Sequence, residues 1–169
     1  MKIARLGWLA YGLAALVIAA DQWVKHYLIG PFHLADKDSV EILPFFHLTA
    51  VANHGVSLGM LQAGDGFGRW ALAVFSAVAA LALAVWAARL TRLTSAVAIG
   101  LILGGAVGNL VDRVRLGAVV DFLDFRGLGF PWIFNLADSA ITVGVILLMI
   151  NSLLTPASPP SAPTTTVKS

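Results

Sequence analysis

The chain has 169 residues, of which 59% are hydrophobic and only 12% are charged, whereas a soluble domain has about 45–50% apolar and about 25% charged residues. This composition excludes an ordinary soluble globule, and a net charge of +2 excludes a basic surface of the kind that binds nucleic acid. The absence of cysteine excludes disulfides, thiolate metal sites and a cysteine nucleophile. The sequence therefore predicts a small integral membrane protein with a single domain.

Four apolar segments approach the roughly 20 helical residues that cross a hydrocarbon core about 30 Å thick. In chain order they cover residues 6–29, 70–88, 95–112 and 134–154. We expect one four-span membrane domain over residues 1–154 and a disordered Pro/Ser/Thr-rich cytoplasmic tail over residues 155–169. Because Lys2 and Arg5 precede the first segment, it could alternatively be a cleaved signal peptide. Its apolar pattern resumes beyond Asp21, which favours a retained span.

Four spans place both termini on one side of the membrane, together with the short connection that contains Arg89 and Arg92. The opposite side carries at least as many basic residues, so the count of Lys and Arg does not decide the orientation. We base the orientation on the tight turn with Arg89 and Arg92 and predict that both termini are cytoplasmic.

The two long connections, residues 30–69 and 113–133, are then extracytoplasmic. Apolar and polar residues alternate around residues 40–43 and 46–49, which predicts short strands on the membrane surface. Residues 113–133 contain several glycines and a proline and are predicted to be mostly turn and loop. The predicted fold class is an all-α membrane protein with a small β element, in which four transmembrane helices carry a short strand-containing loop.

Aspartates in or beside the spans need an explanation, because a charge at the bilayer centre costs at least about 2.5–3.5 kcal/mol. Asp21 and Lys25 are spaced i, i+4 on one helical face and can form an ion pair. Asp112 lies beside Arg113 at a helix end. Both aspartates therefore have a structural interpretation.

Asp121 and Asp138 lack such neighbours. Asp138 lies about one turn into the fourth span, on the face shared by Asn135 and Thr142, and Asp121 lies just beyond the third span at a similar depth. Two nearby carboxylates cannot cheaply both ionise, so they share one proton and supply a base and an acid together. From spacing alone three interpretations stay open: a catalytic dyad, a proton or cation pathway, and satisfied structural acids.

Asp21, Asp112, Asp121 and Asp138 all lie within five short sequence motifs. These motifs are Asp21-Gln22-x-x-Lys25; Phe46-x-Leu48-Thr49-x-x-x-Asn53-x-Gly55; Gly104-Gly105-x-x-Gly108-Asn109-x-x-Asp112-Arg113; Gly117-x-Val119-x-Asp121-Phe122; and Phe134-Asn135-x-Ala137-Asp138. Through these motifs the chain resembles the lipoprotein signal peptidase (signal peptidase II) family over about residues 20–145. Two positions depart from the family pattern. Val24 stands where many members have serine or threonine, and Val56 to Gly59 replace small residues followed by phenylalanine.

The resemblance implies a membrane aspartyl endopeptidase that removes signal peptides from prolipoproteins by cutting before a diacylglyceryl-modified cysteine. It implies that Asp121 and Asp138 are the catalytic pair that activates water. It further implies that seven residues bind the substrate or orient the site, namely Asp21, Lys25, Asn53, Gly55, Asn109, Arg113 and Asn135. The expected location is the bacterial cytoplasmic (inner) membrane, and the expected partners are diacylglyceryl-modified prolipoproteins and membrane lipids. We expect no metal or other cofactor, and a monomer, because the site is self-contained.

Other interpretations compete with this one. Gly55-Val56-Ser57-Leu58-Gly59 spells the G-x-S-x-G nucleophile elbow, but no histidine follows His54 in the sequence, as that elbow requires. The first long loop also holds His33, Asp36, Asp38, Glu41, His47 and His54. Their spacing fits no standard metal motif, so we interpret them as a solvated surface. A small carrier that uses Asp21, Asp121 and Asp138 as proton sites is another alternative, but the sequence lacks the repeated halves common in transporters. A non-catalytic scaffold is a further alternative, and it would stay functional with asparagine at both Asp121 and Asp138.

Overall fold

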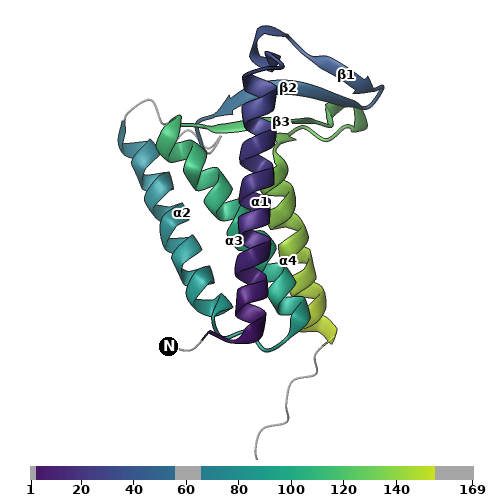
Figure 1. Cartoon of the computed structure of the whole chain (residues 1–169). Helices are drawn as coiled ribbons and strands as arrows, with labels where there is room; N and C mark the ends of the chain where they lie inside the picture. The colour runs from purple at the N-terminus through teal and green to yellow at the C-terminus, as the bar shows by residue number, and fades with distance from the viewer. Residues whose placement is uncertain (1–2, 56–65, 155–169) are drawn as a thin grey trace, which may run out of the picture.

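The computed structural model describes residues 3–55 and 66–154, and it shows four long helices with a small sheet at one end (Figure 1). The helices are α1 (Arg5–Ile29), α2 (Gly66–Ala87), α3 (Leu93–Arg115) and α4 (Leu136–Leu154). The strands are β1 (Val40–Leu43), β2 (Phe46–Asn53), β3 (Val119–Asp124) and β4 (Ile133–Phe134), with short 3₁₀ helices η1 (Leu34–Asp36) and η2 (Arg126–Leu128). All four long helices are long and apolar enough to cross a membrane. The predicted fold class is confirmed, while the predicted tail lies outside the described residues.

The helix α3 is the centre of the bundle, since it packs against α1, α2 and α4. Half of its apolar window is buried, against 17% to 22% in the other three helices. Glycines permit this close packing, as small residues do in membrane helices. A Cβ at Gly104 would lie 2.8 Å from the carbonyl oxygen of Ala14 on α1, and one at Gly105 would overlap the carbonyl oxygen of Ala137 on α4.

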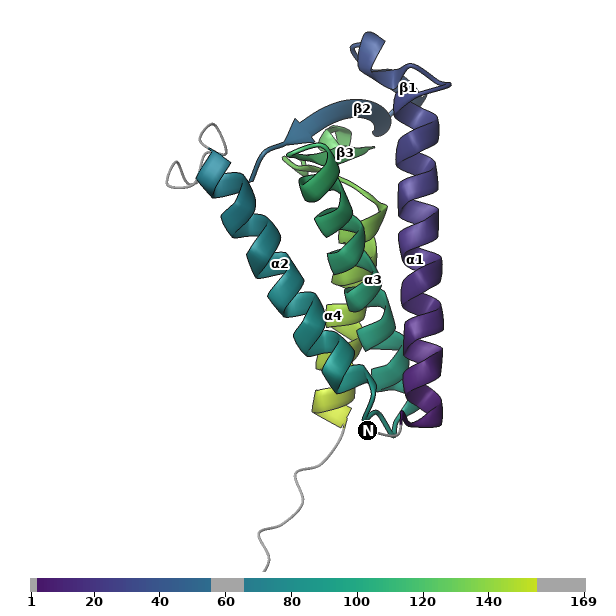
Figure 2. The same cartoon turned by 60° about the vertical axis from the view of Figure 1, so that its left-hand side comes forward.

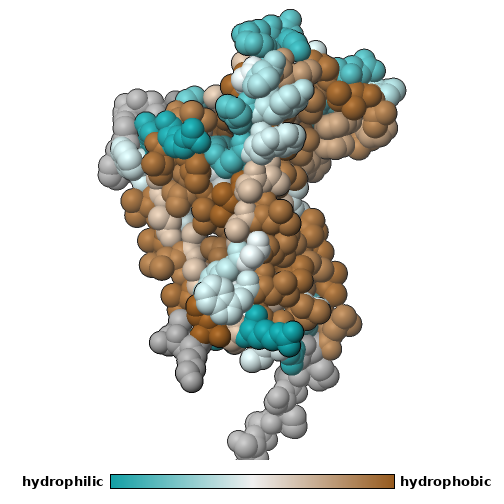
Figure 3. All heavy atoms as spheres, viewed as in Figure 1, coloured by the Kyte–Doolittle hydropathy of each residue, from teal (hydrophilic) through white to brown (hydrophobic). Residues whose placement is uncertain are grey.

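On the face of the bundle that Figure 3 shows, the surface is mainly apolar along the helices and hydrophilic towards both ends. Large side chains such as Trp23, Phe75, Leu81 and Leu153 are exposed on the bundle. A continuous exposed apolar surface of this extent is typical of a protein that faces lipid.

The helix α2 is inclined to the other helices and leans away from α1 near the sheet (Figure 2). At that end Arg69 of α2 donates hydrogen bonds to the carbonyl oxygens of Arg113 and Val114, at 3.0 and 2.7 Å. These carbonyls belong to the last turn of α3, where a cation is favourable because of the helix dipole. Arg69 therefore attaches the splayed end of α2 to the central helix.

The sheet is antiparallel, with the strand order β1-β2-β3-β4. The prediction that residues 113–133 form mostly turn and loop is incomplete, because it missed β3, which lies within this range, and β4, which begins at its last residue. Four of the six residues of β3 are buried, with neighbours such as Asp121 and Phe122 both inside, so β3 lacks the alternation that identifies a half-buried strand. Its pairing with β2, for example Val51 opposite Asp121, comes from a distant part of the chain.

The contact between α1 and α3 gives a prediction about stability. A Gly104→Ala substitution would place its Cβ 2.7 Å from the Cβ of Val17, and overpacking of this kind costs about 1–3 kcal/mol. We expect a lower thermal unfolding midpoint in detergent micelles. Gly12→Ala is the matched control, because no atom lies within 4 Å of its Cβ and alanine favours the helix. Equal midpoints for the two variants would contradict close packing at Gly104.

Candidate active site

Two asparagines connect the carboxyl groups of Asp121 on β3 and Asp138 on α4. The Asn135 side chain donates to Asp121 Oδ1 at 2.7 Å and to Asn109 Oδ1 at 3.1 Å. The Asn109 side chain donates in turn to Asp138 Oδ1 at 2.8 Å. The structure therefore brings these four sequence-predicted residues into one hydrogen-bonded network at the sheet end of the bundle.

The position of Asp138 follows from how α4 begins. Asn135 precedes the helix, and its Oδ1 accepts the backbone N–H of Asp138 at 2.9 Å, while Asp138 Oδ2 accepts the backbone N–H of Asn135 at 3.3 Å. This reciprocal arrangement is a capping box, which satisfies backbone donors that the first turn of a helix leaves free. The Asn-x-x-Asp spacing therefore fixes the carboxyl of Asp138 at the start of α4.

Asp121 is only 2% exposed and accepts a second hydrogen bond from the Asn53 side chain, at 3.0 Å to its Oδ2. Burial raises the pKa of Asp121 above its ordinary value, the hydrogen bond from Asn53 opposes that rise, and the negative charge of Asp138 adds to it. The two carboxyl groups are thus electrostatically coupled. The negative charge of Asp138 thus favours the protonated form of Asp121.

Gly55 explains how Asn53 is aimed at Asp121. The backbone N–H of Gly55 donates to Asn53 Oδ1 at 3.0 Å, which turns the amide nitrogen of Asn53 towards the carboxyl. Gly55 has a φ of 118°, a conformation that residues with a side chain rarely adopt. The Asn-x-Gly motif is therefore a local device that supplies one hydrogen-bond donor.

The other sequence-predicted residues lie one layer behind this network. Lys25 is within 2.8 Å of Asp21 Oδ2 and 2.7 Å of Asp112 Oδ2, so Asp112 forms its ion pair with Lys25 rather than with the adjacent Arg113. Arg113 is half-buried, and its guanidinium donates to the carbonyl oxygen of Asn109 at 3.4 Å. Neither of the two cations, Lys25 and Arg113, makes a direct hydrogen bond to Asp121 or Asp138 among the bonds of the described residues.

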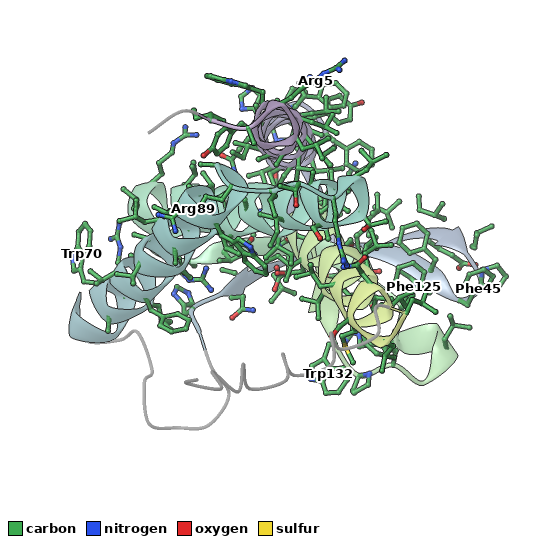
Figure 4. All side chains as sticks on the ribbon, turned by 90° about the horizontal axis from the view of Figure 1, so that it is seen from below. Arg5, Phe45, Trp70, Arg89, Phe125 and Trp132 are labelled. Atoms are coloured by element: carbon green, nitrogen blue, oxygen red, sulfur yellow. The ribbon has the colours of Figure 1, made fainter. Side chains whose placement is uncertain are left out.

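An apolar groove, which the sequence analysis missed, opens beside Asp138. It has a volume of about 410 Å³ and is lined by Phe130, Trp132, Phe134, Asp138, Ser139, Thr142 and Val143. Figure 4, viewed along the helices, shows Phe125 and Trp132 on the α4 side of the bundle and Trp70 on the α2 side. The aromatic residues between Gly127 and Asn135 were the available sequence signal.

The loop that supplies the aromatic wall is attached to the sheet through Asp124. Arg126 donates to both carboxylate oxygens of Asp124, at 2.9 and 2.6 Å, and Thr49 donates to one of them at 2.9 Å. The hydrogen bonds from Arg126 hold the pKa of Asp124 well below its ordinary value. We call these three residues the Asp124 latch.

The sequence also offered two alternative sites, a serine nucleophile elbow and a metal site in the first long loop. The G-x-S-x-G motif with Ser57 falls largely outside the described residues. Across residues 3–55 and 66–154, no three His, Asp or Glu side chains come together as metal ligands would. His33 and Asp36 approach to 3.3 Å, but both side chains are more than 70% exposed.

Comparisons with known proteins agree with one another. The sequence model of the family described as signal peptidase (SPase) II matches residues 13–154. The chain is 48% identical to the lipoprotein signal peptidase of Caulobacter vibrioides, over 91% of this chain and 92% of that protein. It is 45% identical to the lipoprotein signal peptidase of Rhizorhabdus wittichii, over 86% of each. A solved bacterial membrane enzyme is similar to it, with a TM-score of 0.75, 33% identity and coverage of 90% and 91%.

The Asp124 latch gives a prediction about pH. Because the folded pKa of Asp124 lies below its unfolded value, its stabilising effect is complete above about pH 4 and is lost as the pH falls towards the folded pKa. We therefore expect Asp124→Asn to lower the unfolding midpoint at pH 7, and the difference from the wild type to shrink below about pH 4. Thermal unfolding in detergent at several pH values measures it. A difference that is constant across that range would show that the ion pair does not act in this way.

Proposed function

Since the chain belongs to the signal peptidase II family of aspartic proteases, we propose that Asp121 and Asp138 are the groups with which it cleaves prolipoproteins before a diacylglyceryl-modified cysteine. The observation that carries this proposal is the network in which Asn135 and Asn109 join the two carboxyl groups. The open alternatives of a proton carrier and a scaffold are set aside, because the relatives that match most of this chain are named lipoprotein signal peptidases.

Hydrolysis of an amide needs an activated water, a polarised carbonyl and a proton for the leaving nitrogen. A carboxyl pair with one proton supplies all three. In our proposal the ionised member takes a proton from water, which attacks the scissile carbonyl carbon, while the protonated member donates a hydrogen bond to the carbonyl oxygen. The proton gained from water then passes to the leaving nitrogen as the C–N bond breaks. The coupling between Asp121 and Asp138 supports this division of roles.

The groove beside Asp138 suits an apolar part of the substrate. Its wall is aromatic, and Thr142 and Val143 continue it along the apolar helix α4. A diacylglyceryl group remains among acyl chains, so the peptide bond beside it stays near the membrane surface. The start of α4, which follows directly on the sheet, lies where such a bond would be presented.

We further propose that the sheet end is extracytoplasmic and that both termini are cytoplasmic. Arg5 and Arg89 lie at the end opposite the sheet, seen nearest the viewer in Figure 4. Basic residues in short connections favour the cytoplasmic side. All groups of the proposed site come from one chain, which supports a monomer as the active form in the bacterial inner membrane.

The dyad is tested by Asp121→Asn and Asp138→Asn, assayed with purified protein and a lipidated precursor peptide. Each variant removes a group that transfers a proton, so cleavage should fall by at least about 100-fold. Unfolding midpoints near that of the wild type would show that both variants fold. Asp38→Asn is the control, since Asp38 is exposed and lies outside the network, and its activity should be unchanged. Substantial cleavage by either dyad variant would remove that carboxyl from the mechanism.

A second test uses the hydrogen bond that the Asn53 side chain donates to Asp121. The hydrogen bond from Asn53 lowers the pKa of Asp121, so Asn53→Ala should raise it. The alkaline limb of kcat/KM against pH, which reports the second proton lost from the pair, should then shift to higher pH. Ser39→Ala is a control outside the network, at an exposed position, and should leave the limb in place. A limb that stays or shifts to lower pH in Asn53→Ala would contradict this role of Asn53.

A further inference from the structure

Asp21, Lys25 and Asp112 form a buried ionic cluster between α1 and α3. Asp21 is fully buried, Asp112 is 2% exposed and Lys25 is 5% exposed. The ammonium group of Lys25 bonds to both carboxylates, at 2.8 and 2.7 Å. Replacing a buried ion cluster with apolar side chains is often neutral for stability or better. Stability alone therefore gives no reason for charges at this place.

The carboxylates of this cluster accept two backbone N–H groups from outside it. Asp21 Oδ1 accepts the N–H of Ala137 at 3.1 Å, and Asp112 Oδ2 accepts the N–H of Val120 at 3.2 Å. Ala137 immediately precedes Asp138, and Val120 immediately precedes Asp121. Each acid of the cluster therefore bonds to the backbone directly before one of the two proposed catalytic carboxyls.

We propose that Asp21, Lys25 and Asp112 are positioning residues that set the separation of the Asp121 and Asp138 carboxyls, and we call them the Lys25 clamp. The inference rests on the proposed function of that pair. Lys25 joins the two acids, because its ammonium group bonds both to the carboxylate that supports α4 and to the carboxylate that supports β3. The Gln22 amide donates to the same two carboxylates, at 3.2 and 2.8 Å, but carries no charge. The two segments come from different parts of the chain, and no other ion pair of the described residues joins their supports.

The expected signature of the Lys25 clamp is a change in kcat without a change in KM. A displacement of about 1 Å at reacting groups costs about 100-fold in rate, whereas the groove beside Asp138 contains no atom of the clamp. Loss of the clamp should leave substrate binding intact and impair the chemical step.

The first test compares Asp112→Ala with Asp112→Asn in the full-length protein and a lipidated precursor peptide. The alanine variant removes the acceptor for the Val120 N–H, and we expect kcat to fall about 10-fold to 100-fold with KM within about twofold. The asparagine variant keeps one acceptor oxygen, which can still accept the Val120 N–H. Its new amide nitrogen would then face Gln22, which donates to Asp112 Oδ1 at 2.8 Å in the wild type and can turn its own side-chain amide to accept instead. It should recover most of kcat. Equal loss in both variants, or wild-type kcat in Asp112→Ala, would overturn the proposal.

The second test removes only the donor, by replacing the backbone amide of Val120 with an ester. We expect the same fall in kcat as in Asp112→Ala, and no additional fall when the two changes are combined. If Asp112→Ala does not fold, the ester variant alone decides the matter, because it retains every side chain: its kcat should fall about 10-fold to 100-fold, and a wild-type kcat would overturn the proposal. Independent, additive effects would overturn the proposal.

Two controls separate the possible failures. Tyr11→Phe removes a hydrogen bond of 2.7 Å to the carbonyl oxygen of Ala84 and destabilises the bundle away from the site, so it should lower the unfolding midpoint and leave kcat unchanged. The dyad variants report on the proposed function itself. If they cleave, the proposed function fails; if they are inactive and Asp112→Ala keeps the wild-type kcat, only the clamp fails.

Discussion

A carboxyl group at the edge of a membrane must receive hydrogen bonds, because an unpaired buried charge is among the most costly features a protein can contain. Asp21, Asp112, Asp121 and Asp124 are all nearly inaccessible to solvent. Among the described residues, no buried side-chain nitrogen or oxygen lacks a hydrogen-bond partner. Much of the architecture of the sheet end can be understood as the means of supplying those donors. Asparagine amides, backbone N–H groups and a few cations converge there from α1, α3, α4 and the sheet.

Close helix packing makes this convergence possible with short side chains. An aspartate on α1 can reach the backbone of α4 only because both helices lie against the glycine-rich face of α3. Gly108 shows the connection directly, since a Cβ there would lie 3.0 Å from Asp21 Oδ2 and 3.5 Å from the Cβ of Ala137. A larger residue would occupy the space through which Asp21 bonds to Ala137. The apolar packing of the bundle and the polar network at its end are therefore one construction.

Sequence reasoning succeeded where the deciding interactions are local. The Asp21 and Lys25 pair follows from helical spacing and is confirmed, and so are four apolar helices. The strand β3 was missed because its pairing partner β2 lies far away in sequence. The ion pair of Asp112 with Lys25 was missed for the same reason, since the neighbour Arg113 was closer along the chain. The catalytic roles of Asp121 and Asp138 stay predictions, carried by the family motifs and by the geometry around them.

The strand β3 carries two buried aspartates whose environments differ in the kind of donor they receive. Asp124 bonds directly to the guanidinium of Arg126, which lowers its pKa and makes it a permanent anion suited to holding a loop. Asp121 bonds to the neutral amides of Asn53 and Asn135, and burial raises its pKa. Neutral donors satisfy the carboxylate oxygens without adding the positive charge that would keep both carboxyls ionised. The cation Lys25 bonds to Asp21 and Asp112 instead, so its charge lowers the pKa of Asp121 only from a distance and without a hydrogen bond to that carboxyl.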